Sequence, residues 1–508
     1  MGIQCQTLVV VGGGSAGWLT ANALLKSLPE HKVVLIEDPN TPTIGVGEGS
    51  TPALKAFFDL LNVPENKWMP ACDATYKNGI RFVNWSSKQE FQSYFHAFPS
   101  IIDNNTLSPF FHNCQKRVSG QNVVVNPNEF FLTAKLSELK KSPIPTDNFP
   151  FDVNYGYHFD SGKLASFLSS YAKTLGIRHI QQKVERVVVG ANGNISSLIL
   201  QEGQEIRGDV FFDCSGFNSL IAKQVLDIPF VSYKDQLLNN TAVVIKQIET
   251  GLVRESQTIS KAMSAGWSWQ IPLVSRKGHG YVFSSNFINK EQAKQELLKS
   301  IDDDGMSLEG EFKFIDFKLG RLSHFWDKNC IAIGLSQGFI EPLEATALFI
   351  IQQTVGKFID YWLAGNCSDT YRDRFNNELT DLFDGIKDYV LLHYKLGGRE
   401  DSDYWRFITH EVELPNRLIA LQKAWLAGKH FVPVIKELGL DKYYPISSWY
   451  SIFAGSGYFS TVLNNVDEER FNVAKVQDFI CRASMNYSDH VTELNKIRVP
   501  INSNNGNI

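Results

Sequence analysis

Hydrophobic residues near the start of the chain form two short runs, separated by a glycine-rich turn and a helical segment. The run Leu8–Val11 is apolar and β-branched, which is typical of a buried strand. Residues 19–26 are rich in alanine and leucine and predict a helix. A second apolar run, Lys32–Glu37, predicts a second strand. The order strand, helix, strand favours a parallel α/β sheet.

Apolar strands that end in small residues return later in the chain. Residues 209–213 predict a strand that runs into Cys214-Ser215-Gly216, and residues 330–333 predict one that ends at Gly334. Residues 75–125 have a strand-rich pattern. The chain has a mostly helical pattern from residue 366 onward, with apolar residues spaced by three and four. The pattern therefore combines a wound α/β region with a helical module.

The first turn contains a spacing that suits a nucleotide. Gly12, Gly14 and Gly17 form G-x-G-x-x-G between the first strand and the first helix. Glycines at this spacing allow a tight turn, close approach of a pyrophosphate, and close packing of the helix on the strand. Glu37 ends the second strand twenty residues after Gly17, where an acid that binds a ribose hydroxyl is expected. These features predict a dinucleotide-binding domain.

Composition excludes several classes of protein. The 508 residues are 43% hydrophobic and 20% charged, with a net charge of -5 and no basic run, which argues against nucleic acid and anionic membranes as partners. The seven cysteines include no C-x-x-C pair, which argues against a disulfide framework or a metal site. No signal peptide is evident, and the apolar stretch 347–363 contains polar residues, so we expect a buried helix there and a cytoplasmic protein without a membrane span.

One later strand carries a distinctive pattern of tryptophans. Residues 266–272 contain W-x-W-x-I-P, and two tryptophans on one strand can also be simple core packing. Beside the nucleotide motifs, however, this pattern resembles the signature of flavin-dependent halogenases of the tryptophan halogenase family. The resemblance covers nearly the whole chain. Its signature residues are Trp267, Trp269, Ile271 and Pro272, and further matching stretches are Gly45–Pro52, Tyr157–Asp160, Asp213–Gly216, Gly338–Thr346 and 388–405.

The resemblance implies an α/β fold with a Rossmann-like FAD-binding domain of the flavin monooxygenase type, a β-sheet layer and a mostly helical substrate module. We expect residues 1–105 and 155–365 to bind FAD and halide, and residues 106–154 and 366–508 to form the helical substrate-binding module. FAD would act as FADH2, which with O2 converts a halide (chloride, bromide or iodide) to hypohalous acid. The implied cofactor-binding residues are Gly12, Gly14, Ser15, Ala16, Gly17, Glu37, Gly47, Glu48, Val187, Asp213, Gly334 and Leu343.

Two residues take on catalytic roles through the resemblance. Taken alone, Lys77 is a lysine in a turn, and Glu344 is an acid at a helix start, where the helix dipole favours it. The family implies that Lys77 holds the oxidised halogen, as an N-haloamine or by hydrogen bonding, and presents it to an aromatic carbon. Glu344 would stabilise the ring cation and take its proton. The backbone N–H groups of Thr346 and Ala347 are the implied halide site.

The substrate site is implied by three aromatic residues. His96 and Phe98 resemble a pair that sandwiches an indole, and Trp449 is assigned to the same pocket, although His96 could equally be a structural histidine. The tryptophan pair would keep the organic substrate away from the flavin. Residues 441–455 lack the glutamate and the spacing that hold the amino group of free tryptophan in the family, which argues against free L-tryptophan as substrate.

The predicted function is therefore halogenation of an electron-rich, indole-like aromatic compound. No second nucleotide motif is evident for NAD(P)H, so a separate flavin reductase would supply FADH2. Two alternatives remain: an aromatic hydroxylase or epoxidase of the same fold, and an inactive protein that binds flavin or an aromatic ligand. Lys77, Glu344 and the W-x-W-x-I-P strand favour the halogenase. The sequence leaves open the natural substrate, the position of halogenation, the preferred halide and whether the protein forms a homo-oligomer.

Overall fold

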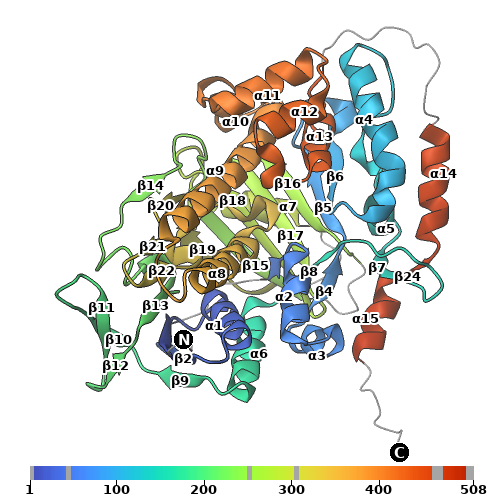
Figure 1. The fold of residues 1–508 in the computed structure, drawn as a ribbon. Coiled ribbons are helices and arrows are strands. Elements are labelled where there is room, and N and C mark those ends of the chain that lie inside the picture. Colours follow the sequence, from blue (N-terminus) through green and yellow to red (C-terminus); the bar gives the residue numbers. More distant parts are fainter. Residues whose placement is uncertain (1–4, 42–46, 249–254, 302–307, 460–472, 499–508) are drawn as a thin grey trace, which may run out of the picture.

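A parallel sheet holds the N-terminal nucleotide motif (Figure 1). The computed structural model describes residues 5–41, 47–248, 255–301, 308–459 and 473–498. The first strand lies inside this six-stranded sheet and pairs in parallel with its neighbours on both sides. The order of the strands is β21 (Trp326–Asp327), β22 (Cys330–Ala332), β13 (Val210–Asp213), β1 (Thr7–Val11), β2 (Lys32–Glu37) and β9 (Arg178–Gln181). The predicted wound α/β sheet is confirmed.

A second, mostly antiparallel sheet carries the tryptophan pattern at its centre. Its order is β19 (Leu308–Asp316), β15 (Thr241–Ile248), β18 (Arg276–Phe283), β17 (Gly266–Pro272), β16 (Thr258–Met263), β5 (Gly79–Val83) and β6 (Ser93–Ala97). A small sheet of β3 (Glu48–Gly49), β8 (Gly156–Phe159) and β4 (Thr75–Lys77) leads directly into β5. Lys77 is therefore the last residue of a strand beside the larger sheet.

Three further small sheets complete the strands. They are β10 (Val184–Val189), β11 (Ile195–Leu200) and β12 (Glu205–Arg207); then β14 (Phe230–Ser232), β20 (Gly320–Leu322) and β23 (Gly338–Phe339); then β7 (Lys141–Pro145) with β24 (Tyr487–Asp489). In the printed view, β10, β11 and β12 project from the lower left edge of the molecule (Figure 1).

Helices cover the sheets. Helix α1 (Ser15–Ser27), which follows the first strand, contacts both α6 (Ser161–Thr174) and α8 (Ala347–Ala364). Helices α10 to α13 gather at the top of the printed view beside α4 (Figure 1). The remaining helices are α2 (Ala53–Leu61), α3 (Glu65–Ala71), α4 (Asn104–Val118), α5 (Leu132–Glu138), α7 (Lys290–Ser300), α9 (Arg372–Leu396), α10 (Asp403–Glu411), α11 (Asn416–Leu426), α12 (Phe431–Glu437), α13 (Ile446–Gly455), α14 (Val473–Ser484) and α15 (His490–Arg498).

One continuous hydrophobic core joins these layers. It runs from Leu8 of β1 through Phe82 of β5 to Leu379 of α9 and Ile452 of α13, all of which are fully buried. Because both sheets and the helices share this core, burial of apolar side chains stabilises the sheets and the helices together. The side chains at the junction are thereby held in place.

The prediction that residues 75–125 are strand-rich was wrong for their second half. Residues 104–118 form helix α4, which buries Thr106, Phe110, Asn113, Cys114 and Arg117 on one face. Three of these side chains are polar, so hydropathy alone hides the helical period. The helix predicted over 347–363 is confirmed as buried α8, and among the described residues no helix is long and apolar enough to cross a membrane. Residues 42–46, with Gly45, and the tail 502–508 lie outside the described residues.

Candidate functional site

The G-x-G-x-x-G turn leaves open space at one of its three glycines. Gly12 has a φ of +117°, and a Cβ there would clash with the carbonyl oxygen of Cys214. A Cβ at Gly17 would clash with the carbonyl oxygen of Gly12, whereas a Cβ at Gly14 would meet no atom within 4 Å. Gly12 and Gly17 must therefore be glycines, because backbone carbonyl oxygens occupy the space that a Cβ would need. Gly14 faces open space at the start of α1, where a pyrophosphate can reach the helix N–H groups.

The carboxylate of Glu37 lies over the same turn. It stands at the end of β2, and its Oε1 atom is 2.7 Å from Nε2 of His179 on β9. A Cβ on Gly13 would clash with the other carboxylate oxygen, so the acid leans across the glycines. This position suits an acid that accepts hydrogen bonds from ribose hydroxyls, so the residues present fit a bound FAD.

Three of the other predicted cofactor residues lie at this turn, and Val187 does not. Ser15 and Ala16 form the first turn of α1, and a Cβ on Gly334 would lie 2.7 Å from the Cβ of Ala16. Val187, in contrast, lies on β10 in a separate sheet, where it pairs with Leu198.

Asp213 is fully buried at the end of β13. Its Oδ2 atom accepts hydrogen bonds from the backbone N–H groups of Ile221 and Ala222, at 2.8 and 2.9 Å. Its carboxylate therefore secures the loop that follows the strand. Two predicted cofactor residues are neighbours in the chain: Gly47 has a φ of +120°, and burial raises the pKa of Glu48 to about 7. Leu343 is buried next to Glu344 in the chain.

Lys77 is completely buried, with 0% of its surface exposed. Its Nζ atom donates a hydrogen bond to the carbonyl oxygen of Ser50 at 3.2 Å and stands 5.5 Å from the ring centre of Phe98. Burial lowers the pKa of Lys77 to about 7, although the nearby charge of Glu344 raises it. The amine is thus poised between its neutral and charged forms near neutral pH.

Glu344 lies between two histidines from different elements. Its carboxylate is 3% exposed, 2.8 Å from Nδ1 of His96 on β6 and 2.7 Å from Nε2 of His393 on α9. Burial raises the pKa of Glu344, but the charge and hydrogen bonds of the two histidines outweigh it and lower the pKa to about 2. Burial also lowers the pKa of His393. The site therefore holds a fixed negative charge.

Of the predicted substrate residues, His96 contacts Glu344 directly, whereas Trp449 packs against Tyr389. His96 lies beside Glu344, and its Nε2 atom is 2.8 Å from Oγ of Ser448 on α13. Both ring nitrogens of His96 are therefore engaged. Trp449 is fully buried, its ring centre 4.9 Å from that of Tyr389, and its indole N–H donates to the backbone of Leu440 at 3.2 Å.

The tryptophan pair lies on β17. The ring centres of Trp267 and Trp269 are 5.8 Å apart, and a Cβ on Gly280 would clash with the Trp269 ring. The strand ends at Ile271 and Pro272, which are buried. Gly280 thus leaves room for the Trp269 ring on the neighbouring strand.

The predicted halide residues stand at the start of α8. Ala345 has a φ of +55° and turns the chain from the 3-10 turn η6 (Pro342–Glu344) toward the helix. Thr346 is the residue before α8, and Ala347 is its first residue. Backbone N–H groups at a helix start suit an anion.

Two residues that the sequence analysis missed contribute to the site. The first is His393, described above. The second is His158 on β8, which lies 3.1 Å from Oγ1 of Thr75 through Nδ1 and 2.9 Å from Oγ1 of Thr258 through Nε2. The Thr75 hydroxyl already donates to the carbonyl oxygen of Pro272 at 2.7 Å, so Nδ1 must be the donor to Thr75. His158 is thereby a neutral link between the Lys77 strand β4 and the neighbouring strand β16. Its matching stretch, Tyr157–Asp160, was the available signal.

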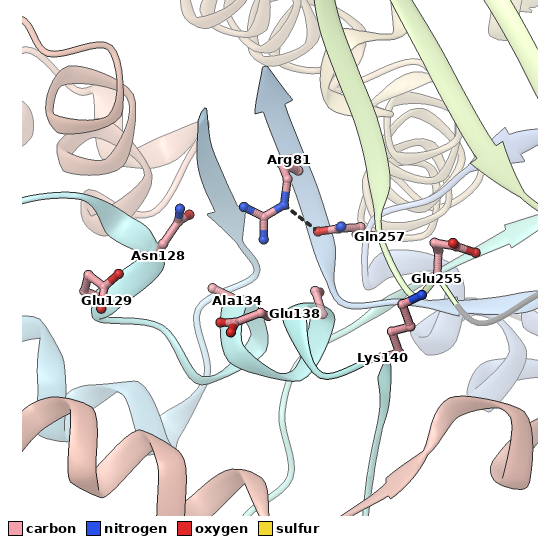
Figure 2. A pocket seen from close by; sticks show the side chains of 9 residues that line it. Arg81, Asn128, Glu129, Ala134, Glu138, Lys140, Glu255 and Gln257 are labelled. Atoms are coloured by element: carbon pink, nitrogen blue, oxygen red, sulfur yellow. Dashed lines mark hydrogen bonds between the residues drawn. The ribbon is translucent and has the colours of Figure 1, made fainter. Parts of the chain in front are cut away.

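A separate polar cavity of about 380 Å³ opens on the other side of β5 and β6 (Figure 2). Ile80 pairs with His96 and Arg81 with Phe95, so Arg81 points to the face opposite His96. Arg81 donates a hydrogen bond to Oε1 of Gln257 at 3.0 Å, and charged side chains of both signs surround it. This cavity is therefore distinct from the Lys77 and Glu344 site.

Comparison with known proteins agrees with these features. The tryptophan halogenase family model matches residues 7–470. Tryptophan 6-halogenase SttH of Streptomyces toxytricini is 33% identical over 424 residues, covering 78% of this chain and 80% of that protein. Tryptophan 7-halogenase RebH of Lentzea aerocolonigenes is 33% identical over 419 residues, 78% of each protein. The structure of Xcc4156, a flavin-dependent halogenase from Xanthomonas campestris, has a TM-score of 0.82 at 25% identity, covering 97% of this chain and 98% of that one. This chain belongs to the tryptophan halogenase family of flavin-dependent enzymes.

Proposed function

We propose that the protein transfers an oxidised halogen from Lys77 to an electron-rich, indole-like aromatic ring. The observation that carries this proposal is the buried amine of Lys77, beside the Phe98 ring and near the histidine-bound carboxylate of Glu344. A hydroxylase or an inactive binding protein has no need of a buried lysine whose pKa is lowered to about 7. FAD, supplied as FADH2 by a separate reductase, provides with O2 the oxidising power that converts halide to hypohalous acid.

Lys77 can receive the halogen in two ways. The neutral amine attacks the halogen of hypohalous acid, so that an N–halogen bond forms and water leaves. The charged amine instead donates a hydrogen bond to the oxygen of hypohalous acid. A pKa near 7 makes both forms available at neutral pH. In the first route the C–halogen bond forms as the N–halogen bond breaks, the ring loses its proton, and the amine regains one.

Glu344 stabilises the cationic ring that this attack creates. A carboxylate with a pKa of about 2 is a weak base, so its fixed negative charge is its main contribution. Glu344 takes the proton that the ring loses, while the ring N–H groups of His96 and His393 donate hydrogen bonds to its two oxygens and hold the carboxylate in place. The backbone N–H groups of Thr346 and Ala347 hold the halide at the start of α8.

The substrate proposed here is an indole-like aromatic compound other than free L-tryptophan. Tyr443 and Tyr444 match family positions, but the Tyr443 hydroxyl already donates to Asp381 at 2.5 Å. The Tyr444 ring stacks on Tyr389 with ring centres 3.7 Å apart. The Tyr443 hydroxyl is therefore already engaged, whereas the Tyr444 hydroxyl has no hydrogen-bond partner among the described residues. We assign FAD and halide binding to residues 1–105 and 155–365, and substrate binding to residues 106–154 and 366–508.

One reaction panel tests the proposal. The protein is incubated with FAD, a flavin reductase, NADH, O2 and chloride, bromide or iodide, over a set of indoles and phenols that includes free tryptophan. Mass spectrometry should find halogenated product with the wild type and none with Lys77→Ala, while flavin oxidation continues in both. Lys183→Ala, at an exposed position, is the matched control and should keep full activity. Oxygenated product alone would overturn the proposal.

A further inference from the structure

Glu341 is a second buried carboxylate of the Glu344 loop, and the reaction steps above do not involve it. It stands directly before the turn η6 and is 0% exposed. Its Oε2 atom accepts hydrogen bonds from Nε1 of Trp267 at 2.7 Å, the hydroxyl of Tyr394 at 2.7 Å and Nδ2 of Asn239 at 2.8 Å. Its Oε1 atom has no hydrogen-bond partner among the described residues. A buried carboxylate with this many donors is a built arrangement.

The donors around Glu341 all lead toward one oxygen. The Tyr404 hydroxyl donates to Oδ1 of Asn239 at 2.9 Å. The Asn239 amide then donates to Glu341 and to the oxygen of Tyr394, whose own proton goes to Glu341. Every hydrogen bond in this cluster therefore has a fixed direction, and the chain of donors leads to the carboxylate of Glu341. Removal of the carboxylate would leave several buried donors without an acceptor.

This cluster attaches the tryptophan pair to the catalytic loop. Trp267 lies on β17 with its ring 5.8 Å from that of Trp269, and its only polar atom donates to Glu341. Three residues after Glu341, Glu344 holds His96 and His393. A hydrogen bond to a charged acceptor is short and directional, so it restricts rotation of the Trp267 ring.

We propose that Glu341 is a positioning residue that fixes the Trp267 ring against the Glu344 loop and so keeps halide oxidation coupled to halogen transfer. The inference rests on the proposed function, because the family resemblance gives the tryptophan pair its expected role, as a barrier between flavin and organic substrate, only in a halogenase. A Trp267 ring that is free to rotate would open that barrier. Oxidising equivalents would then be lost without product.

The contact is tested first on ¹⁵N-labelled protein without flavin. The chain has ten tryptophans, and the indole N–H resonance of Trp267 is identified by its disappearance in Trp267→Phe. We expect this resonance to move upfield in Glu341→Gln, because a neutral amide is a weaker acceptor than a carboxylate. Tyr404→Phe, which removes a hydroxyl of the same cluster that does not touch Glu341, should leave it in place. An unmoved resonance in Glu341→Gln would overturn the proposal.

The coupling is then measured as moles of halogenated product per mole of FADH2 oxidised. We expect about a tenfold drop in Glu341→Gln, with the rate of flavin oxidation unchanged, because the hydrogen bond that holds the Trp267 ring is weakened. Trp267→Phe removes the same bond from the other side and should give a similar drop even if Glu341→Gln fails to fold. A shifted resonance with unchanged yield would overturn the positioning role. If the wild type forms no halogenated product, the proposed function fails and the coupling role fails with it, while the resonance still reports the contact.

Discussion

Replacing Lys77 with methionine should make the stability of the protein depend on pH in a predictable way. The amine is 0% exposed, and burial lowers its pKa from 10.5 to about 7. Such a shift corresponds to about 5 kcal/mol of folding free energy, because each pKa unit is worth about 1.4 kcal/mol. Methionine fills a similar volume without a charge. The substitution therefore removes this cost.

The sign follows from the protons that each state binds. Between pH 7 and pH 10.5 the unfolded chain keeps the lysine proton that the folded protein releases, so the folded wild type gains stability as the pH rises. Below pH 7 both states are protonated and the full cost is present. Lys77→Met should thus be more stable than the wild type at pH 7, and the difference should shrink by about 2 kcal/mol at pH 9.

Urea unfolding at pH 7 and pH 9 measures this difference. The wild type and Lys77→Met are compared at each pH by midpoint and slope, so that changes in the other titrating groups cancel. Lys183→Met, at an exposed position, is the control and should differ from the wild type equally at both pH values. A free-energy difference between wild type and Lys77→Met that stays within about 0.5 kcal/mol from pH 7 to pH 9 would refute the reasoning.

Four further substitutions address the catalytic and cofactor sites. His393→Gln should lower kcat for halogenation about a hundredfold with flavin oxidation unchanged, because it disturbs one of the two hydrogen bonds that hold the Glu344 carboxylate, and an unchanged kcat would contradict this role. His158→Gln should cost about 2 kcal/mol in urea unfolding, since two buried hydrogen bonds are disturbed, and a wild-type midpoint would argue against the assigned link. Glu37→Ala should weaken FAD binding about tenfold in a flavin fluorescence titration. His179→Ala should have a smaller effect, because His179 only orients the acid. A dissociation constant for Glu37→Ala equal to that of the wild type would exclude the ribose role.

The parts of the fold that could be predicted depend on contacts close along the chain. The helix predicted over residues 19–26 lies within α1 (Ser15–Ser27), because its alanines and leucines favour a helix by themselves. Gly12 and Gly17 could be singled out because backbone atoms in the turn exclude any side chain there. Helix α4 was missed because its buried face includes Arg117, which pairs with Glu90 at 2.6 Å, so the partner that makes burial possible is not visible in the local sequence.

The site residues likewise divide into those that the sequence could indicate and those that only tertiary packing brings to the site. Lys77 and Glu344 could be named only through the family resemblance, since a lysine in a turn and an acid at a helix start are ordinary surface features. The histidines that decide the charge of Glu344 come from β6 and α9, and no spacing in the sequence predicts that they meet. Burial and partner identity arise from tertiary packing, and these two properties set the pKa values on which the chemistry depends.

The E-P-L-E turn shows how far environment separates identical side chains. Glu341 and Glu344 are both fully or almost fully buried, and burial raises the pKa of each. Glu341 faces indole, phenol and amide donors, which carry no charge, and its pKa stays above the ordinary value. Glu344 faces two histidines, which lower its pKa to about 2. Neutral donors suit a carboxylate that anchors a tryptophan ring, whereas histidines suit one that stabilises a cation and takes its proton. The division of labour between the two glutamates therefore follows from the groups that each one meets, three residues apart on a single turn.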